Sequence, residues 1–262
     1  MEIASYDILR AIVLGAALLM ILALEWRAPN ALLERPWRTN LGLWLVDTAL
    51  MRVACGACGL LVAAWVDARD VGLLQRFELP AWLAIAFAIV MLDGVSWLWH
   101  RANHRIPWLW RWHRIHHADR AFQVTTALRC HPGELLLALP VRLVAIALLG
   151  LTPAGVIAFE LCFGVMNLLV RGNVDLPRRL DGLVGRLLVT PAAHRLHHGR
   201  SAAAMNSNFG TLFSLFDRAG GTWHAGRPGL QVDTGLPAPE GDIQMGLLHA
   251  VAPPFSRRAD RA

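Results

Sequence analysis

Five long apolar runs constrain this chain more than any other feature of its sequence. They cover residues 8–24, 41–66, 79–99, 135–150 and 153–170, and most approach the ~20 residues that an α-helix needs to cross a bilayer. Charged residues make up only 17% of the chain, and the mean hydropathy is +0.42, which is too apolar for an ordinary soluble domain. We therefore expect an all-α integral membrane protein with four to five transmembrane or re-entrant helices.

Three details of these runs leave more than one membrane arrangement open. The last two runs are separated only by residues 151–152, which predicts an antiparallel helical hairpin that either crosses the membrane or re-enters it. The second run contains Asp47 and Arg52, which either pair inside the bundle or indicate a tilted crossing. The first run follows Glu2 and Asp7 rather than a basic segment, which favours a retained helix over a cleaved signal peptide.

Histidines stand in three groups at or near the ends of these runs, at spacings that suit metal ligation. Residues three or four apart lie on one face of a helix, so each group can offer several imidazoles to one point. Eight imidazoles exceed the four ligands of one structural zinc and suit two metal ions, and nitrogen ligands fit iron, zinc, copper or nickel. The candidate ligands are His100, His104, His113, His116, His117, His194, His197 and His198.

Arginine accounts for all the basic charge of the chain, because the sequence contains no lysine. If the amino terminus is outside, the arginine-rich segments 27–38, 101–129 and 171–200 all fall on the cytoplasmic side, together with the histidine groups. We therefore expect a cytoplasmic helical cap that carries the histidines, and no nucleic-acid partner. The arginine-, alanine- and leucine-rich composition is typical of a GC-rich bacterial genome, so the expected location is a bacterial inner membrane.

One acidic residue lies inside an apolar run close to the first histidines. Asp93 shares nearly one helical face with His100 and His104, and an acid within a membrane segment is costly enough to suggest a function. Its carboxylate either accepts a hydrogen bond from a ligand imidazole, which would fix the tautomer, or pairs with Arg52 or Arg101.

Six motifs between residues 92 and 222 carry a resemblance to a known family. They are Asp93-x6-His100-Arg101-x-x-His104, Leu109-Trp110-Arg111-Trp112-His113-x-x-His116-His117, Thr125-Thr126-Ala127-Leu128-Arg129-Cys130-His131-Pro132-x-Glu134, Asn173-Val174-x-Leu176-Pro177, Thr190-Pro191-x-x-His194-x-x-His197-His198, and Asn206-Ser207-Asn208-Phe209-Gly210 with Phe216-Asp217-Arg218. This part of the chain resembles the fatty acid hydroxylase and sterol desaturase superfamily of membrane histidine-box di-iron oxygenases.

The resemblance implies two iron ions held by the histidines, for which zinc can substitute in a preparation, and O2 as co-substrate. The implied reaction is hydroxylation or desaturation of a C–H bond in a lipid, whether a sterol or hopanoid, a carotenoid, a sphingoid, an acyl or an ether lipid. No flavin, haem or nucleotide motif is visible, so we expect a separate electron donor, a ferredoxin or a cytochrome b5-like protein with its reductase.

The chain departs from the family pattern at Arg171, where relatives commonly have a histidine two residues before the asparagine that matches Asn173. Either the site has one imidazole fewer, or His131, water or substrate fills the place. Arg171 is also a candidate contact for an anionic lipid headgroup. His131 and Asn173 lie in matching motifs and are candidates for additional ligands or for contacts beside the metals.

The predicted organisation has three segments. Residues 1–78 form N-terminal membrane helices, residues 79–222 a fatty acid hydroxylase-like histidine-box domain, and residues 223–262 a tail without clear periodicity, expected as a loose or partly disordered cap. Two other functions compete with the oxygenase. One is a zinc-dependent membrane lipid hydrolase, and the other is a non-catalytic membrane protein that retains the metal site.

Overall fold

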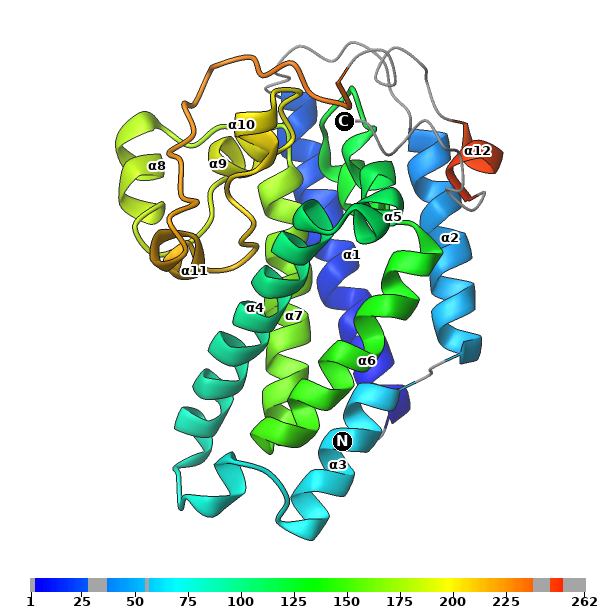
Figure 1. Cartoon of the computed structure of the whole chain (residues 1–262), viewed down its shortest axis with the longest axis vertical. Helices are drawn as coiled ribbons and strands as arrows, with labels where there is room; N and C mark the ends of the chain where they lie inside the picture. The colour runs from blue at the N-terminus through cyan, green and yellow to red at the C-terminus, as the bar shows by residue number, and fades with distance from the viewer. Residues whose placement is uncertain (1–2, 28–36, 55–56, 238–245, 252–262) are drawn as a thin grey trace.

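The computed structural model describes residues 3–27, 37–54, 57–237 and 246–251, and these residues form helices without any named β-strand. Figure 1 shows long helices that run roughly along one direction and short helices gathered at one end. The elements are α1 (Ile3–Arg27), α2 (Trp37–Ala54), α3 (Cys58–Arg69), η1 (Leu74–Arg76), α4 (Ala81–Arg105), α5 (Pro107–His117), η2 (Val124–Leu128), α6 (Pro132–Leu149), α7 (Pro153–Arg171), α8 (Arg178–Val184), α9 (Pro191–His197), α10 (Ala202–Met205), α11 (Leu215–Ala219) and α12 (Leu247–Val251).

Five helical segments are long and apolar enough to cross a membrane. They are α1, the α2–η1 region, α4, α6 and α7. This confirms the expected all-α membrane fold. The chain ascends and descends so that α1, α4 and α7 all end where α5 and the short helices lie (Figure 1), which places the three histidine groups at one end of the bundle, as their sequence positions predict.

The second apolar run differs from the expectation in two ways. It forms two helices, α2 and α3, and Ala57 before α3 does not have helical backbone angles. The suggested pairing of Asp47 with Arg52 is also wrong, because the Arg52 guanidinium lies 2.7 Å from a carboxylate oxygen of Asp7 in α1. Asp47 is instead buried, and Arg52 fastens α2 to the start of α1.

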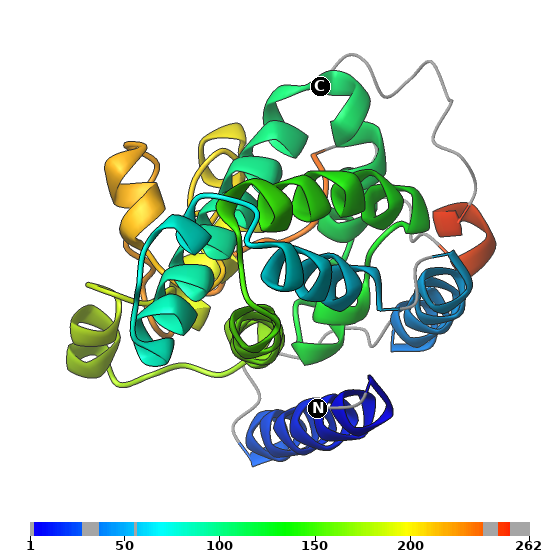
Figure 2. The same ribbon diagram turned by 90° about the horizontal axis from the view of Figure 1, so that it is seen from below.

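The last two long helices are antiparallel, but they diverge from their short link rather than packing along their length (Figure 1). Helix α7 packs against α1, α3 and α4, and α6 packs against α2, α3 and α4. Figure 2, seen from below, shows α1 beside α7 at one edge of the bundle. With 18 and 19 residues, at ~1.5 Å per residue, both helices are long enough to run from the far end to the histidine end.

The far end of the bundle closes where two glycines meet. Gly150 ends α6 with φ 71° and Gly72 precedes η1 with φ 105°, a left-handed backbone that favours glycine. A Cβ on Gly72 would lie 2.4 Å from the Cα of Gly150. The α3–α4 connection therefore packs directly on the end of α6, and this close approach excludes side chains at both positions.

The helices that carry the second and third histidine groups begin with proline, which has the backbone angle of a first helical turn and needs no hydrogen-bond acceptor there. Pro107 begins α5, and the extended Ile106 before it separates α5 from α4, as expected of a residue that precedes proline. Pro191 begins α9, where the Thr190 hydroxyl accepts from the Ala193 amide at 3.3 Å. These starts fix where the second and third histidine groups lie.

Part of the carboxyl-terminal segment is ordered against the histidine end, unlike the loose cap expected from its composition. The Arg200 amide donates to the Asp233 carbonyl at 3.0 Å. Leu236 is buried in one cluster with Leu43 of α2 and Ile115 of α5. Residues 238–245 and 252–262 lie outside the described structure, so the expectation for them stays untested.

Candidate metal centre

The predicted ligands converge from three elements. The end of α4, the end of α5, and α9 with the residue that follows it carry all eight histidines, and Figure 1 shows these elements at the end of the bundle where α1, α4 and α7 end. Seven of the eight are buried, and His104 is partly buried. Burying so many imidazoles together without a carboxylate to pair with each one costs free energy. Their gathering in one place therefore indicates that they share a binding partner.

The eight imidazoles form two groups rather than one. Within each group, the ring nitrogens that could bind one ion all lie within 4.8 Å of one another. The first group, called here the five-histidine pocket, contains His100, His104, His113, His117 and His197. The second group, called here the three-histidine pocket, contains His116, His194 and His198.

Helix geometry explains this division. In each His-x-x-His-His sequence the first and last residues are four apart and share a face, whereas the middle histidine points about 100° away from its neighbour. His113 and His117 therefore enter the five-histidine pocket while His116 enters the other. In α9 the assignment is reversed, because the residues four apart enter the three-histidine pocket and His197 enters the five-histidine pocket.

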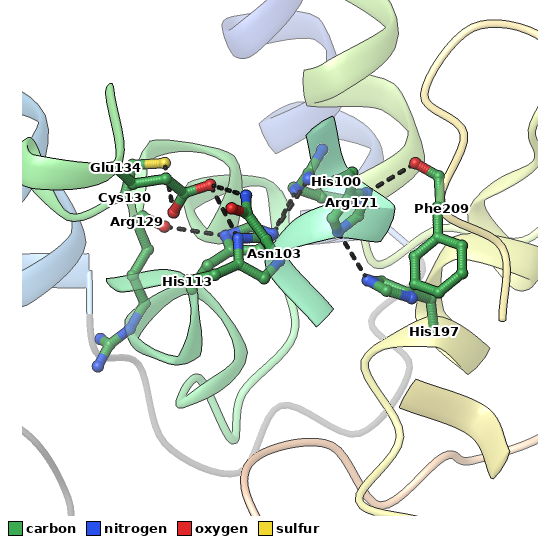
Figure 3. Close-up of polar contacts among 10 residues, drawn as sticks. His100, Asn103, His113, Arg129, Cys130, Glu134, Arg171, His197 and Phe209 are labelled. Carbon is green, nitrogen blue, oxygen red and sulfur yellow. Dashed lines mark hydrogen bonds and ion pairs between the residues drawn. The ribbon is translucent and has the colours of Figure 1, made fainter. Parts of the chain in front are cut away.

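Four of these eight histidines are oriented by a hydrogen bond at Nδ1, and Figure 3 shows the bonds of His100 and His113 among them. Three of the partners are backbone carbonyls, which only accept, so each of those Nδ1 atoms carries the proton and Nε2 is left with a lone pair. The fourth partner is a carboxylate. The pairs are His100 with Phe209 O at 2.7 Å, His113 with Glu134 Oε1 at 2.8 Å, His116 with Arg129 O at 2.9 Å, and His197 with Ser207 O at 2.6 Å.

The five-histidine pocket fits a metal ion on two observations. His100 Nε2 and His197 Nε2 lie 3.0 Å apart, and both have lone pairs in the tautomers just assigned, so a cation between them is needed to relieve their repulsion. Two nitrogens about 2.1 Å from one ion and at right angles would lie about 3 Å apart. In addition, Nε2 of His113 and both ring nitrogens of His117 are buried without a hydrogen-bond partner among the described residues.

The three-histidine pocket contains a guanidinium beside its imidazoles. Both ring nitrogens of His194 and of His198 are buried and have no hydrogen-bond partner in the described chain, so each imidazole has a nitrogen left for a metal ion. Arg171, at the end of α7, donates to His116 Nε2 from Nε at 3.3 Å and from Nη2 at 3.1 Å. Its Nη1 donates to Asn167. With 6% exposure, Arg171 directs its donors at protein atoms rather than outward toward a headgroup.

Burial favours the neutral form of four of these imidazoles. It lowers the pKa of His117 and His198 well below 6.5, with the neighbouring imidazoles as the next cause. Burial likewise lowers the pKa of His194, where the Arg171 charge adds to the effect, and lowers that of His197 to about 3. The neutral imidazole is the form that binds a metal ion, so the pockets are preset for ligation at neutral pH.

Asp93 lies on the predicted helical face, but its partners differ from those suggested by the sequence. Its two carboxylate oxygens accept from the backbone amides of Leu212 and Phe213 at 3.2 and 3.0 Å. The Nδ1 proton of His100 goes to the Phe209 carbonyl instead. Asp93 thus fastens α4 to the segment that supplies this carbonyl, and it acts on the imidazole through the backbone.

The other two candidates lie outside both pockets. His131 is the N-cap of α6, where its Nδ1 accepts from the Gly133 amide at 2.9 Å, and its ring packs on Trp112 with centroids 4.7 Å apart. The amide of Asn173 donates to Glu25 at 2.6 Å, and its side-chain oxygen accepts from Arg195 at 3.4 Å. Neither residue belongs to a group of candidate ligands.

Two acidic residues that support the ligands escaped selection from the sequence. Glu134 accepts from His113 and also from the Asn103 amide at 3.1 Å (Figure 3). Asp217 is fully buried and accepts from the amides of Phe209 and Gly210 at 2.9 and 2.7 Å. Both lie in motifs that carry the family resemblance, which was the available signal, but the carbonyls that orient His100 and His197 have no signature in a sequence.

Aromatic rings cover the five-histidine pocket. Trp110 packs on His104 with ring centroids 5.1 Å apart and on His117 at 5.5 Å. Phe209 packs on His104 at 5.2 Å and on His197 at 5.6 Å. These apolar rings exclude water from the ligand nitrogens, which strengthens electrostatic interactions inside the pocket.

Known proteins match the part of the chain that contains the two pockets. The fatty acid hydroxylase family model matches residues 85–222. An ornithine lipid hydroxylase from Rhizobium tropici is 27% identical over 179 residues, which cover 68% of this chain and 52% of that protein. Alkylglycerol monooxygenases from Danio rerio and Homo sapiens are each 30% identical, over 60% and 50% of this chain. The chain spans only 31% and 28% of their lengths, and no solved structure matches. Since the family model covers more than half of the sequence, the chain belongs to the fatty acid hydroxylase family.

Proposed function

We propose that this protein is a membrane-bound oxygenase that uses two iron ions and O2 to hydroxylate or desaturate a lipid. The observation that carries the proposal is the gathering of eight imidazoles into two pockets at one end of five apolar helices. Such a centre needs ligand nitrogens that are neutral, oriented and protected from water. Burial, the hydrogen bonds at Nδ1 and the aromatic cover supply these properties to the imidazoles described above.

When bound, the two irons would supply the redox chemistry that activates O2 toward an unreactive C–H bond. The five-histidine and three-histidine pockets would each hold one ion. The carbonyls of Ser207 and Phe209 and the carboxylate of Glu134 hold the imidazole rings in place. Trp110 and Phe209 keep water away from the ligands.

The substrate proposed is a lipid that enters from the bilayer, because the apolar helices reach the site from the membrane side. Two of the relatives are named for ornithine lipid hydroxylation and alkylglycerol oxygenation. Ornithine lipids and alkylglycerol ethers are therefore the first substrates to test, before sterols, hopanoids, carotenoids, sphingoid chains and acyl lipids.

The electrons for the reaction would come from a separate protein. We propose a ferredoxin or cytochrome b5-like donor with its reductase, which would approach the histidine end of the bundle. Arg105 of α4, Arg111 of α5 and Arg120 in the segment after α5 lie at this end, and positive charge steers acidic partners. The same arginines favour a cytoplasmic position for this end in a bacterial inner membrane.

Lipid analysis tests the proposal directly. Lipid extracts from a deletion strain should lack a hydroxyl group or double bond that the parent strain has, and wild-type protein should restore it. His197→Ala should not restore it because it removes a ligand from the five-histidine pocket. His249→Ala in α12, outside both pockets, is the matched control and should restore it fully.

Work with the purified protein separates this function from its competitors. An oxygenase should contain iron, consume O2 when a reductant is added, and incorporate isotopically labelled oxygen into a hydroxylated lipid. Zinc as the sole metal after iron-rich growth, with lipid hydrolysis in the absence of O2, would establish the hydrolase instead. Identical lipids in the deletion and parent strains would favour a non-catalytic protein.

A further inference from the structure

The three-histidine pocket differs from the five-histidine pocket by a positive charge at its ligands. Arg171 places two guanidinium nitrogens on the same atom, His116 Nε2, at 3.1 and 3.3 Å. The other ring nitrogen of His116 is already bound to the Arg129 carbonyl at 2.9 Å. Nε2 is therefore the nitrogen that His116 can offer to a metal ion, and the arginine occupies it.

A guanidinium and a metal ion compete for this lone pair. The arginine is held from its other side by Asn167, one turn earlier in α7, so the contact with His116 is positioned rather than incidental. In the five-histidine pocket, by contrast, His100 Nε2 faces another imidazole nitrogen at 3.0 Å. The described contacts place no arginine side chain on a ring nitrogen of that pocket.

The charge of Arg171 also acts on the pocket as a whole. Arginine stays protonated in proteins, and within the described residues no carboxylate lies at ion-pair distance from Arg171. A unit charge about 4–6 Å away changes the proton affinity of a group by roughly 10- to 1000-fold. A divalent ion bound to His116, His194 and His198 would experience a repulsion at least as strong.

We propose that Arg171 makes the two pockets unequal, so that a divalent transition-metal ion fills the five-histidine pocket first. A second ion enters the three-histidine pocket only when Arg171 releases His116. This inference rests on the proposed metal centre and adds an order of filling to it. Arg171 thus controls the occupancy of the second pocket without being a ligand itself.

Metal titration of the full chain in detergent tests the order of filling. The metal-stripped protein is titrated with Co2+ without O2, because the absorption of Co2+ reports ligation by imidazole, and bound metal is counted by elemental analysis. Wild-type protein should bind one equivalent tightly and a second at least about tenfold more weakly. His198→Ala should abolish the weak event and spare the tight one, and His117→Ala should weaken the tight event.

Variants at Arg171 separate charge from packing. Arg171→Met removes the charge and the donors, so the second equivalent should bind about tenfold more tightly or better. Arg171→Lys keeps the charge and should leave the second site weak. Arg171→Gln is a second neutral variant, and it decides the result if gel filtration shows that the methionine variant does not fold.

The outcomes distinguish this inference from the proposed function. Two equivalents of equal affinity in the wild-type protein, or an unchanged second affinity in folded neutral variants, would overturn the role of Arg171 and leave the oxygenase proposal standing. A folded wild-type protein that binds no Co2+ or Fe2+ at all would overturn both.

Discussion

Glu134 offers the sharpest test of how the protein holds its ligands. Its Oε1 accepts from His113 Nδ1 at 2.8 Å and from Asn103 Nδ2 at 3.1 Å, and the residue is 8% exposed. Glu134→Gln keeps the size and an acceptor oxygen but removes the negative charge. The His113 ring should therefore keep its orientation and become a weaker metal ligand.

The size of the effect follows from the type of hydrogen bond lost. A hydrogen bond to a charged group contributes about 1.5–3 kcal/mol and a neutral one about 0.5–1.5 kcal/mol, so Glu134→Gln should cost about 1 kcal/mol for each of the two bonds. Partners of metal-bound histidines typically change metal affinity by about 10- to 100-fold. We expect roughly tenfold weaker binding for Glu134→Gln. Glu134→Ala should be worse, because it leaves the His113 N–H and the Asn103 amide buried without this acceptor.

The assay is competition between the protein and a chelator of known affinity, with bound metal measured by elemental analysis. Glu160→Gln is the matched control, because Glu160 is a partly buried carboxylate that accepts from Tyr6 in the α1–α7 contact, and its loss should leave metal affinity unchanged. Wild-type affinity in folded Glu134→Gln and Glu134→Ala proteins would refute the view that this carboxylate tunes His113.

Three further predictions concern the pockets and their support. The metal-free protein should lose stability as the pH falls below about 6.5, because unfolded histidines bind protons there whereas burial lowers the pKa of His197 to about 3. The loss should reach up to about 1.4 kcal/mol per pH unit for each histidine whose pKa is lowered in this way, and melting temperatures at several pH values, with and without metal, should show it. Gly155→Ala should lower the melting temperature, since its Cβ would lie 2.6 Å from Ala88 Cβ and overpacking costs about 1–3 kcal/mol, whereas Gly182→Ala, with open space around it, should not. Asp217→Asn should reduce both stability and metal affinity, measured by melting and chelator competition, because the buried carboxylate accepts the amides that hold the ligand-orienting turn.

Much of the fold was accessible from the sequence because membrane helices are recognised by length and apolarity alone. The histidine spacing likewise indicated which residues share a helical face. The division into five and three ligands was not foreseen, because it depends on how α4, α5 and α9 meet in space. Asp93 illustrates the limit most clearly, since its helical face is the one predicted but its partners are the amides of Leu212 and Phe213, which lie far along the chain.

The supports of His100 and His197 show why the pockets depend on the segment after α9. Both rings donate to carbonyls of residues 207–209, and this segment is held by Asp217 and, through residues 212–213, by Asp93 of α4. The segment must therefore dock on α4 before the two Nε2 atoms can face each other.

Each of the two His-x-x-His-His sequences supplies ligands to both pockets, so both pockets depend on the same elements. Helix α5 gives two ligands to the five-histidine pocket and one to the other, and the α9 region gives one and two. Displacing either element would remove imidazoles from both pockets at once, so the two sites depend on the same packing of α5 and α9. The metal affinities of the two pockets can nevertheless differ. Among the ring nitrogens of the described ligands, Arg171 contacts only His116 Nε2, which belongs to the three-histidine pocket. Assembly of the pockets is thus shared, whereas filling of the second pocket has its own control.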